Sequence, residues 1–202
     1  MLVVAAPGWS QVSGTVYEGL TCLSNSTCNA DTAGSHVTGA PSAQFTVSGI
    51  NFDSNTTGYD VDTFLNIPDS SFTNEINGFS PTGTADNTYY VFTGSIYLNA
   101  GVNNFTAGHD DGLNLSLDGG IGTVLDQPNP TGFVSTPFSI TAPSAGNYNY
   151  TLEYDECCGA PAILQWAYTN GLPVGSVPEP GSLVLLGTLV GLTLFARRRL
   201  IS

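Results

Sequence analysis

Apolar residues between Gln11 and about Ala167 recur mostly at every second position, and the segment shows no helical periodicity. Successive side chains of a β-strand point to opposite faces, so this alternation predicts strands that bury one face. Short stretches such as "NAG", "DGG" and "NPTG" separate the alternating segments and predict turns. The predicted strands are 43–52, 89–98, 103–108, 113–118, 134–141, 147–154 and 162–168.

Several short strands with turn residues between them predict an all-β body, an antiparallel β-sandwich over residues 11–175. Residues 54–87 are less regular, and we expect long loops there. Residues 1–10 and 176–202 differ in composition from the body and are treated as separate segments.

The C-terminal segment contains an apolar run without charges, residues 182–196, followed by three arginines. The run has 15 residues, somewhat fewer than the roughly 20 of a bilayer-spanning helix. We predict a transmembrane helix over this run. The positive charges of Arg197, Arg198 and Arg199 then favour a cytoplasmic C-terminus and place the body outside.

A Pro-Glu-Pro tripeptide, Pro178, Glu179 and Pro180, precedes the apolar run. The order of tripeptide, short span and arginines resembles the PEP-CTERM sorting signal of Gram-negative bacteria that produce exopolysaccharide. The resemblance implies that a membrane enzyme, exosortase, recognises the tripeptide, removes the helix, and releases or attaches the body. It implies export across the inner membrane, one membrane span before processing, and a place at the cell surface or outside the cell afterwards.

The first ten residues, "MLVVAAPGWS", have no basic residue, and their apolar run covers only Leu2 to Ala6. The apolar region of a secretory signal needs about 7 to 15 residues. We interpret residues 1–10 as the remnant of a longer signal peptide or as a disordered start. Export without a signal peptide is the alternative.

Nearly all charged residues of the chain are acidic. The chain has 16 acidic residues, no lysine, and only the three C-terminal arginines. Without the tail from Val177 onward, which holds Glu179, the body keeps 15 acidic and no basic residues, a formal charge of −15. This excludes a basic face for nucleic acid or for an anionic membrane surface. Divalent cations are the natural counter-charges.

The four cysteines form two close pairs, Cys22 with Cys28 and Cys157 with Cys158. An even number of cysteines in a chain rich in Gly, Ser, Thr and Asn predicts disulfides in an exported protein. Cys157 and Cys158 either bond to each other or reach back to the first pair. A zinc site is the competing interpretation, but spacings of six and one suit tetrahedral ligation poorly.

Two stretches of the body resemble the anthrax protective-antigen type domain, a β-sandwich also found in flocculins and adhesins. They are "GHDDGLNLSLDG", residues 108–119, and the aromatic strand "NYNYTLEY" that leads through a Gly/Ala loop to a Trp-bearing strand. The resemblance covers residues 89–168 and implies the same fold and sugar binding. The fibro-slime type domain shares the "HDDG" step and is a close rival.

In the sugar-binding members of that family, the peptide bond between the two aspartates is cis and both carboxylates bind one calcium ion. The resemblance therefore implies a Ca²⁺ site at Asp110 and Asp111. A second ligand loop follows the aromatic strand, which adds Asp155 and Glu156 as candidates. Calcium takes six to eight oxygen ligands, so two carboxylates alone are too few. Without the flanking strands, adjacent aspartates would indicate a solvated turn.

These features together predict an exported protein that binds carbohydrate, an exopolysaccharide of the producing cell, through calcium. His109 and Trp166 are candidates for contacts with the sugar, although Trp166 alternates with Leu164 and fits a core position as well. The alternative is a structural protein of the extracellular matrix in which calcium only stabilises the fold. An enzyme is not predicted, because the chain has two histidines and no Gly-x-Ser-x-Gly motif.

Overall fold

The structure is a computed structural model of the 202-residue chain, and it describes residues 11–76, 78–169 and 173–174. The predicted signal remnant at 1–10, the Pro-Glu-Pro tripeptide, the predicted membrane helix at 182–196 and the arginines lie outside the described residues. Within the described ranges, no helix has the length and apolar character needed to cross a bilayer.

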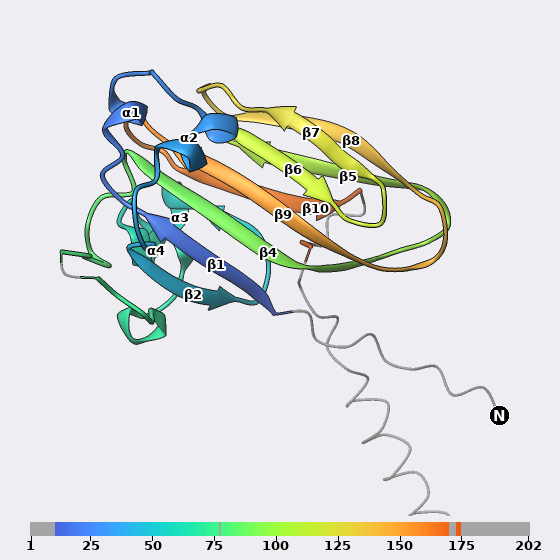
Figure 1. Ribbon diagram of the computed structural model, residues 1–202, viewed down its shortest axis with the longest axis horizontal. Helices are drawn as coiled ribbons and strands as arrows, with labels where there is room; N and C mark the ends of the chain where they lie inside the picture. The colour runs from blue at the N-terminus through green and yellow to red at the C-terminus, as the bar shows by residue number, and fades with distance from the viewer. Residues whose placement is uncertain (1–10, 77, 170–172, 175–202) are drawn as a thin grey trace, which may run out of the picture. The chain divides into compact units, whose positions relative to one another are not determined.

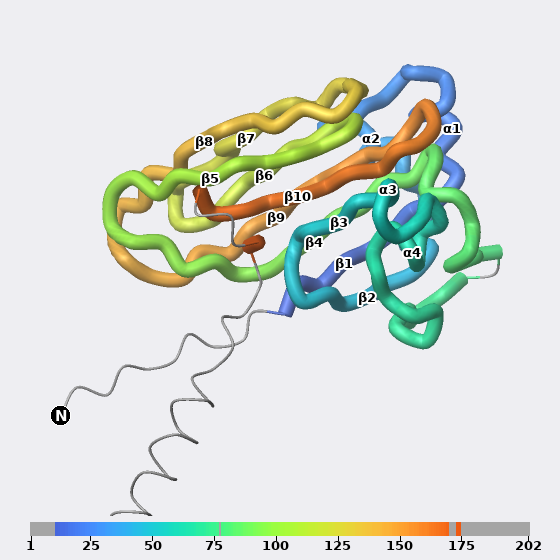
Figure 2. Tube along the Cα trace, turned by 180° about the vertical axis from the view of Figure 1, so that it is seen from behind, coloured from blue at the N-terminus to red at the C-terminus, as the bar shows by residue number. Residues whose placement is uncertain are grey.

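The body consists of two antiparallel sheets that pack face to face (Figures 1 and 2). The larger sheet has the order β2 (Ala43–Val47), β1 (Val12–Tyr17), β4 (Thr88–Leu98), β9 (Gly146–Glu156), β6 (Leu113–Leu117) and β7 (Gly122–Gln127). The smaller sheet has the order β3 (Asn51–Asp53), β10 (Ile163–Tyr168), β5 (Gly101–His109) and β8 (Val134–Ala142). The predicted antiparallel β-sandwich is confirmed.

One predicted strand, 43–52, is wrong as a single element. Its first half is β2 in the larger sheet and its second half leads into β3 in the smaller sheet. Two strands, β1 and β7, were not predicted. In β1 the core-facing position between Val12 and Val16 is Gly14, where a Cβ atom would lie 2.2 Å from the ring of Phe45. The ring of Phe45 thus fills the space that an apolar side chain on β1 would take.

The described residues also contain short helices that the alternation did not indicate: α1 (Thr21–Ser24), α2 (Ala30–His36), α3 (Ser54–Thr57), α4 (Val61–Leu65) and the 3₁₀ turn η1 (Asp69–Ser71). None exceeds seven residues, too short to display a helical period. Capping residues set where they begin: Asn29 and Asp60 form capping boxes with Thr32 and Thr63. The predicted loop region 54–87 thus holds α3, α4 and η1.

Aromatic side chains fill the space between the sheets, including those of Phe64, Tyr90, Phe92, Phe105 and Trp166. Strand alternation sends Tyr90 inward and Tyr89 outward. Tyr89 lies with Leu23, Ala33 and the disulfide cysteines 22 and 28 in a second apolar cluster on the side of the larger sheet that α1 and α2 cover (Figure 1). Cys157 belongs to this second cluster.

The strand pairing brings three connections to one end of the sandwich. Residue Thr88 at the start of β4 pairs with Glu156 at the end of β9. Tyr154, near the end of β9, pairs with Leu113 at the start of β6, so the turn between β5 and β6 lies close by. The turn between β9 and β10 lies at the end of the body next to α1 (Figure 2). This end carries the acidic residues singled out in the sequence.

Candidate functional site

Asp110 and Asp111 lie directly after β5, and hydrogen bonds of their backbone amides fix both residues in place. The amide of Asp110 donates to the carbonyl of Ile163 at 2.9 Å, and the amide of Asp111 donates to the carbonyl of Thr131 at 2.8 Å. The only cis peptide bond in the described part of the chain is Ala160–Pro161, so the cis bond that the resemblance implied between the aspartates is absent. Instead, Asp111 has a left-handed backbone with φ of 69°.

Both aspartate side chains are buried, with exposed fractions of 7% for Asp110 and 4% for Asp111. Successive residues of a regular strand would point to opposite faces. The left-handed conformation at Asp111 breaks this alternation, which is how two neighbouring carboxylates are withdrawn from water together. Desolvation raises the pKa of both.

The carboxylate of Asp111 connects two loops. Its Oδ1 accepts a hydrogen bond from the amide of Thr131 at 3.2 Å, and its Oδ2 accepts one from the amide of Cys157 at 2.8 Å. Burial raises its pKa to about 6, while the Cys157 amide opposes the rise. The turn after β5, the loop before β8 and the loop after β9 therefore meet at Asp111.

Asp155 is fully buried at the end of β9, and neither carboxylate oxygen has a hydrogen-bond partner of good geometry, although the backbone amides of Ala30 and Gly112 lie near enough to lower its pKa. Burial, and then the charge of Asp111, raises its pKa to about 7. A Cβ atom built on Gly112 would lie 1.9 Å from Oδ1 of Asp155 and 2.2 Å from the carbonyl oxygen of Pro128. Two oxygens thus flank Gly112, and one of them is an unsatisfied buried carboxylate, which is costly without a partner.

Glu156 is fully buried but has different neighbours from the aspartates. Its carboxylate accepts hydrogen bonds from the hydroxyls of Tyr59, at 2.9 Å, and Tyr154. Burial raises its pKa to about 10 despite the bond from Tyr154, so Glu156 is neutral at neutral pH. Both oxygens are already hydrogen-bonded, in contrast to those of Asp155.

No group of three or more His, Cys, Asp or Glu side chains in the described ranges is arranged to hold a metal ion. The donor chemistry nevertheless suits a hard cation, because Asp110, Asp111 and Asp155 are buried carboxylates in a chain with no Lys or Arg before residue 197. A calcium ion here would need further oxygens from backbone carbonyls, water or a bound hydroxyl compound.

The structure places His109 and Trp166 away from the surface. His109 is 0% exposed, and its Nδ1 lies 2.7 Å from the carbonyl of Asp111, which can only accept, so Nδ1 carries the hydrogen. Burial lowers the pKa of His109 and keeps the ring neutral. Trp166 is 1% exposed and packs against Phe105 and Tyr150. Trp166 therefore holds the core position that its alternation allowed, and direct sugar contacts of His109 and Trp166 stay a prediction.

The cysteines form the disulfides Cys22–Cys28 and Cys157–Cys158, with Cα–Cα distances of 5.3 Å and 3.7 Å. Cys157 and Cys158 therefore bond to each other and do not reach back to Cys22 and Cys28. Cys157 is buried, whereas Cys158 is exposed and has a left-handed φ of 68°. The Cys157–Cys158 disulfide lies in the loop whose amide binds Asp111.

Several residues that support the site were missed in the sequence. The segment containing α1 and α2 contacts the loop before β8: the amide of Ala30 donates to the carbonyl of Pro128 at 3.1 Å, and Asn29 Nδ2 donates to Asn129 Oδ1 at 2.9 Å. Asp86 lies just before β4, and its charge raises the pKa of Asp111. The partners are far apart in the chain, so no local pattern could reveal these contacts.

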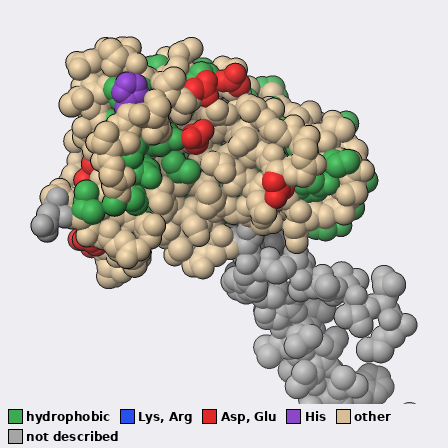
Figure 3. Space-filling view, viewed as in Figure 1, with side chains coloured by type: hydrophobic (Ala, Val, Ile, Leu, Met, Phe, Trp, Pro, Cys, Tyr) green, Lys and Arg blue, Asp and Glu red, His purple; other side chains and the backbone are tan. Residues whose placement is uncertain are grey.

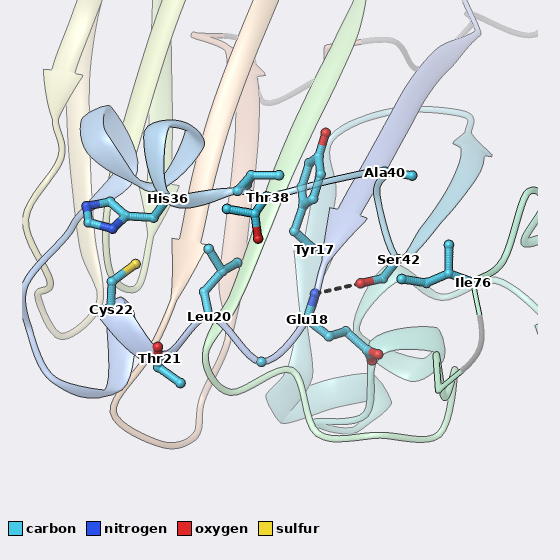
Figure 4. A pocket seen from close by; sticks show the side chains of 12 residues that line it. Tyr17, Glu18, Leu20, Thr21, Cys22, His36, Thr38, Ala40, Ser42 and Ile76 are labelled. Carbon is cyan, nitrogen blue, oxygen red and sulfur yellow. Dashed lines mark hydrogen bonds between the residues drawn. The ribbon is translucent and has the colours of Figure 1, made fainter.

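The surface also has a pocket whose lining does not include Asp110, Asp111 or Asp155. The pocket has a volume of about 310 Å³, and its lining includes Tyr17, Leu20, His36 and Thr38. Figure 4 shows it beside the end of β1. The hydroxyl of Ser42 accepts a hydrogen bond from the amide of Glu18 at 3.0 Å at its edge. Figure 3 shows acidic side chains spread over this face and no Lys or Arg among the described residues.

Comparisons with solved structures concern the fold. A structure described as "PA14 sugar-binding domain from RTX adhesin" matches with a TM-score of 0.59 and 18% identity, over 81% of this chain and 93% of that one. A second, "PA14 domain of MpAFP Antifreeze protein", matches with a TM-score of 0.63 and 18% identity, over 87% and 94%. A third, an "anti-sigma factor domain-containing protein", matches with a TM-score of 0.51 and 16% identity, over 83% and 47%.

Sequence comparison gives one further result for the C-terminal segment. No curated protein matches the chain. A family model described as "PEP-CTERM protein-sorting motif" matches residues 176–199, the segment that contains the Pro-Glu-Pro tripeptide and the arginines. The chain therefore carries a PEP-CTERM protein-sorting motif behind a body with the fold of PA14 domains.

Proposed function

We propose that this protein is exported, is sorted through its C-terminal motif, and binds extracellular polysaccharide through a calcium ion held by Asp110 and Asp111. The observation that carries the proposal is the burial of these two carboxylates together with Asp155, whose oxygens have no hydrogen bond of good geometry, in a body without Lys or Arg. A divalent cation would relieve this unfavourable arrangement.

The wider setting supports the same function. The sorting motif is the substrate signature of exosortase, which implies processing at the membrane of a Gram-negative bacterium and a surface or extracellular body. The predicted helix at 182–196 would hold the chain in the membrane until then. One protein with the same fold is a sugar-binding domain of an adhesin by its description. A cation with open coordination positions could accept the vicinal hydroxyls of a sugar.

Within the proposed site, we assign Asp110 and Asp111 as carboxylate ligands and Asp155 as a third acid close to the ion. Glu156 is the weakest of the four predicted ligands, because burial raises its pKa to about 10 and leaves the carboxyl without charge at neutral pH, hydrogen-bonded to Tyr59 and Tyr154. His109 would act indirectly, since its bond to the Asp111 carbonyl fixes the turn. Trp166 would support β10 from the core.

A structural role for calcium is the second candidate, and the same burial favours it. Carboxylates exposed by 7% or less leave little surface for direct contact with a polymer. In that case calcium would stabilise the fold of a matrix protein without binding a sugar. The two functions predict the same gain in stability with calcium but differ in sugar binding.

The deciding experiment is a glycan array probed with the purified full chain, in a detergent without a sugar headgroup, with calcium and with chelator. We expect binding that chelator abolishes and added calcium restores. Thermal unfolding should show a saturable gain, about 2.7 kcal/mol at a hundredfold excess of calcium over its dissociation constant. Asp111→Asn keeps the side-chain shape and should lose most of that gain.

The outcomes separate the candidates. Saturable stabilisation without binding to any glycan would leave the structural role. No saturable shift in melting temperature, with Asp111→Asn unchanged or slightly more stable because it removes a charge, would exclude the calcium site itself.

A further inference from the structure

We infer that the site selects neutral pyranose polymers and that the ring of Phe133 stacks on the C–H face of the bound sugar. This inference rests on the proposed carbohydrate-binding function and adds the class of sugar and the residue that recognises it.

Phe133 lies next to the two aspartates on the loop before β8. Phe133 lies two residues after Thr131, whose amide donates a hydrogen bond to the Asp111 carboxylate. The backbone amide of Phe133 interacts with the carboxylate of Asp110. Its Cε2 atom lies 3.1 Å from the position that a Cβ atom on Gly108 would occupy. The ring therefore rests against the β5 backbone two residues before Asp110.

The side chain of Phe133 is 53% exposed, in contrast to the aromatic residues of the core. Exposed apolar surface is unfavourable in water, so an exposed ring held beside buried polar groups indicates contact with a ligand. A pyranose ring offers hydroxyls at its edge and C–H groups on a face. The C–H groups carry partial positive charge, which suits the negative face of an aromatic ring. Hydroxyls on the ion and C–H groups on Phe133 would fix the sugar at two points.

The charge of the body sets the class of polymer. Residues 1–196 contain no Lys or Arg that could pair with a uronate, sulfate or phosphate group. The body carries a formal charge of −15, and one bound Ca²⁺ would reduce it only to −13. The negative charge of the body would repel an anionic polysaccharide, whereas a neutral polysaccharide would not be repelled.

The test measures binding of the purified full chain to immobilised dextran, mannan and galactan as neutral polymers, and to polygalacturonate and alginate as uronate polymers, in calcium buffer. We expect at least one neutral polymer to bind and both uronates to bind at least about tenfold more weakly. Phe133→Ala should weaken binding to the neutral polymer about tenfold, which corresponds to the loss of apolar contact with half a phenyl ring. Phe133→Tyr should keep it.

The matched control is Tyr97→Ala. Tyr97 is also 53% exposed, but it lies on β4 nine residues beyond Thr88, which is about 30 Å along a strand from the site end. Binding by Tyr97→Ala should equal that of the unchanged chain. All variants should keep the calcium-dependent rise in melting temperature, which shows that the fold and the ion site are intact.

Phe133→Trp gives a readout that does not depend on an affinity difference. Its exposed indole should emit at shorter wavelength when the neutral polymer covers it. Equal affinity of Phe133→Ala and the unchanged chain, uronate binding as tight as neutral binding, or constant Trp emission despite binding would each overturn the inference and leave the proposed function standing. Failure of the unchanged chain to bind any of the three neutral polymers would also overturn the inference, whereas the proposed function is refuted only if the glycan array shows no calcium-dependent binding.

Discussion

Replacement of Gly112 by alanine tests how tightly the site is packed around Asp155. The added Cβ atom would lie 1.9 Å from Oδ1 of Asp155, 2.2 Å from the carbonyl oxygen of Pro128 and 2.9 Å from its carbonyl carbon. Ordinary contacts begin near 3.4 Å, so Oδ1 would have to move by about 1.5 Å. The Asp155 side chain can rotate, but Pro128 is backbone and its carbonyl is bonded to the amide of Ala30.

Overpacking of this kind destabilises a domain by about 1 to 3 kcal/mol. For a body of this size, each kcal/mol shifts the melting temperature by about 2 to 4 °C. We therefore expect Gly112→Ala to lower the melting temperature by about 2 to 12 °C in scanning calorimetry. The calcium-dependent rise should also shrink, because the carboxylate of Asp155 is displaced.

The matched control is Gly132→Ala in the neighbouring loop, where the added Cβ atom would meet nothing within 4 Å. Neither glycine has a positive φ, so backbone strain does not separate the two variants. Gly132→Ala should be neutral or more stable by about 0.4 to 1 kcal/mol. A Gly112→Ala protein that melts with the unchanged chain or with the control would refute this account of the packing.

Three further predictions concern the acids, the cysteines and the tail. In chelator, the melting temperature should fall as the pH rises from 5 to 9. The pKa of Asp155, about 7, and that of Glu156, about 10, are raised above their ordinary values, so the folded state binds more protons and its stability is lost as the pH passes through these values; a rising melting temperature would contradict the burial of these acids. Thiol labelling without reductant, read by intact mass, should modify no cysteine, because all four form disulfides; a labelled species in freshly exported protein would argue against the pairing. Replacement of Arg197, Arg198 and Arg199 by Gln should leave the body uncleaved or misoriented in cell fractions, since the charges that favour a cytoplasmic C-terminus are gone; normal release would exclude a role for the arginines in sorting.

The sequence predicted the long strands well because their alternation is dense. The segments predicted at 89–98 and 147–154 correspond to β4 and β9, each of which buries every second residue over most of its length. The merged strand at 43–52 shows where this reasoning fails. Its buried apolar residues are spaced by two up to Val47 and by three from Val47 to Ile50. That shift of phase marks the point where the chain passes from one sheet to the other.

Candidate ligands could be identified from the sequence only where neighbours in the chain are also neighbours in space. Asp110 and Asp111 fall in this class. The different surroundings of Glu156 depend on Tyr59, which is 97 residues away, so no local pattern indicates them. Phe133 was missed for a related reason: a phenylalanine after "NPTG" resembles any loop residue until its exposure and its distance to β5 are known.

The hydrogen bonds from Ala30 and Asn29 to the loop before β8 limit how such a domain can diversify. Residues 18–42 also pack Cys22 and Cys28 into one cluster with Cys157, so a single segment supports the loops on both sides of Asp111. A transplant of those two loops onto another sandwich of the same fold would leave the carbonyl of Pro128 without its donor. Changes of ligand preference in evolution would therefore have to be accompanied by changes in residues 18–42, and an engineer who redesigns the loops needs to treat that segment as part of the same unit.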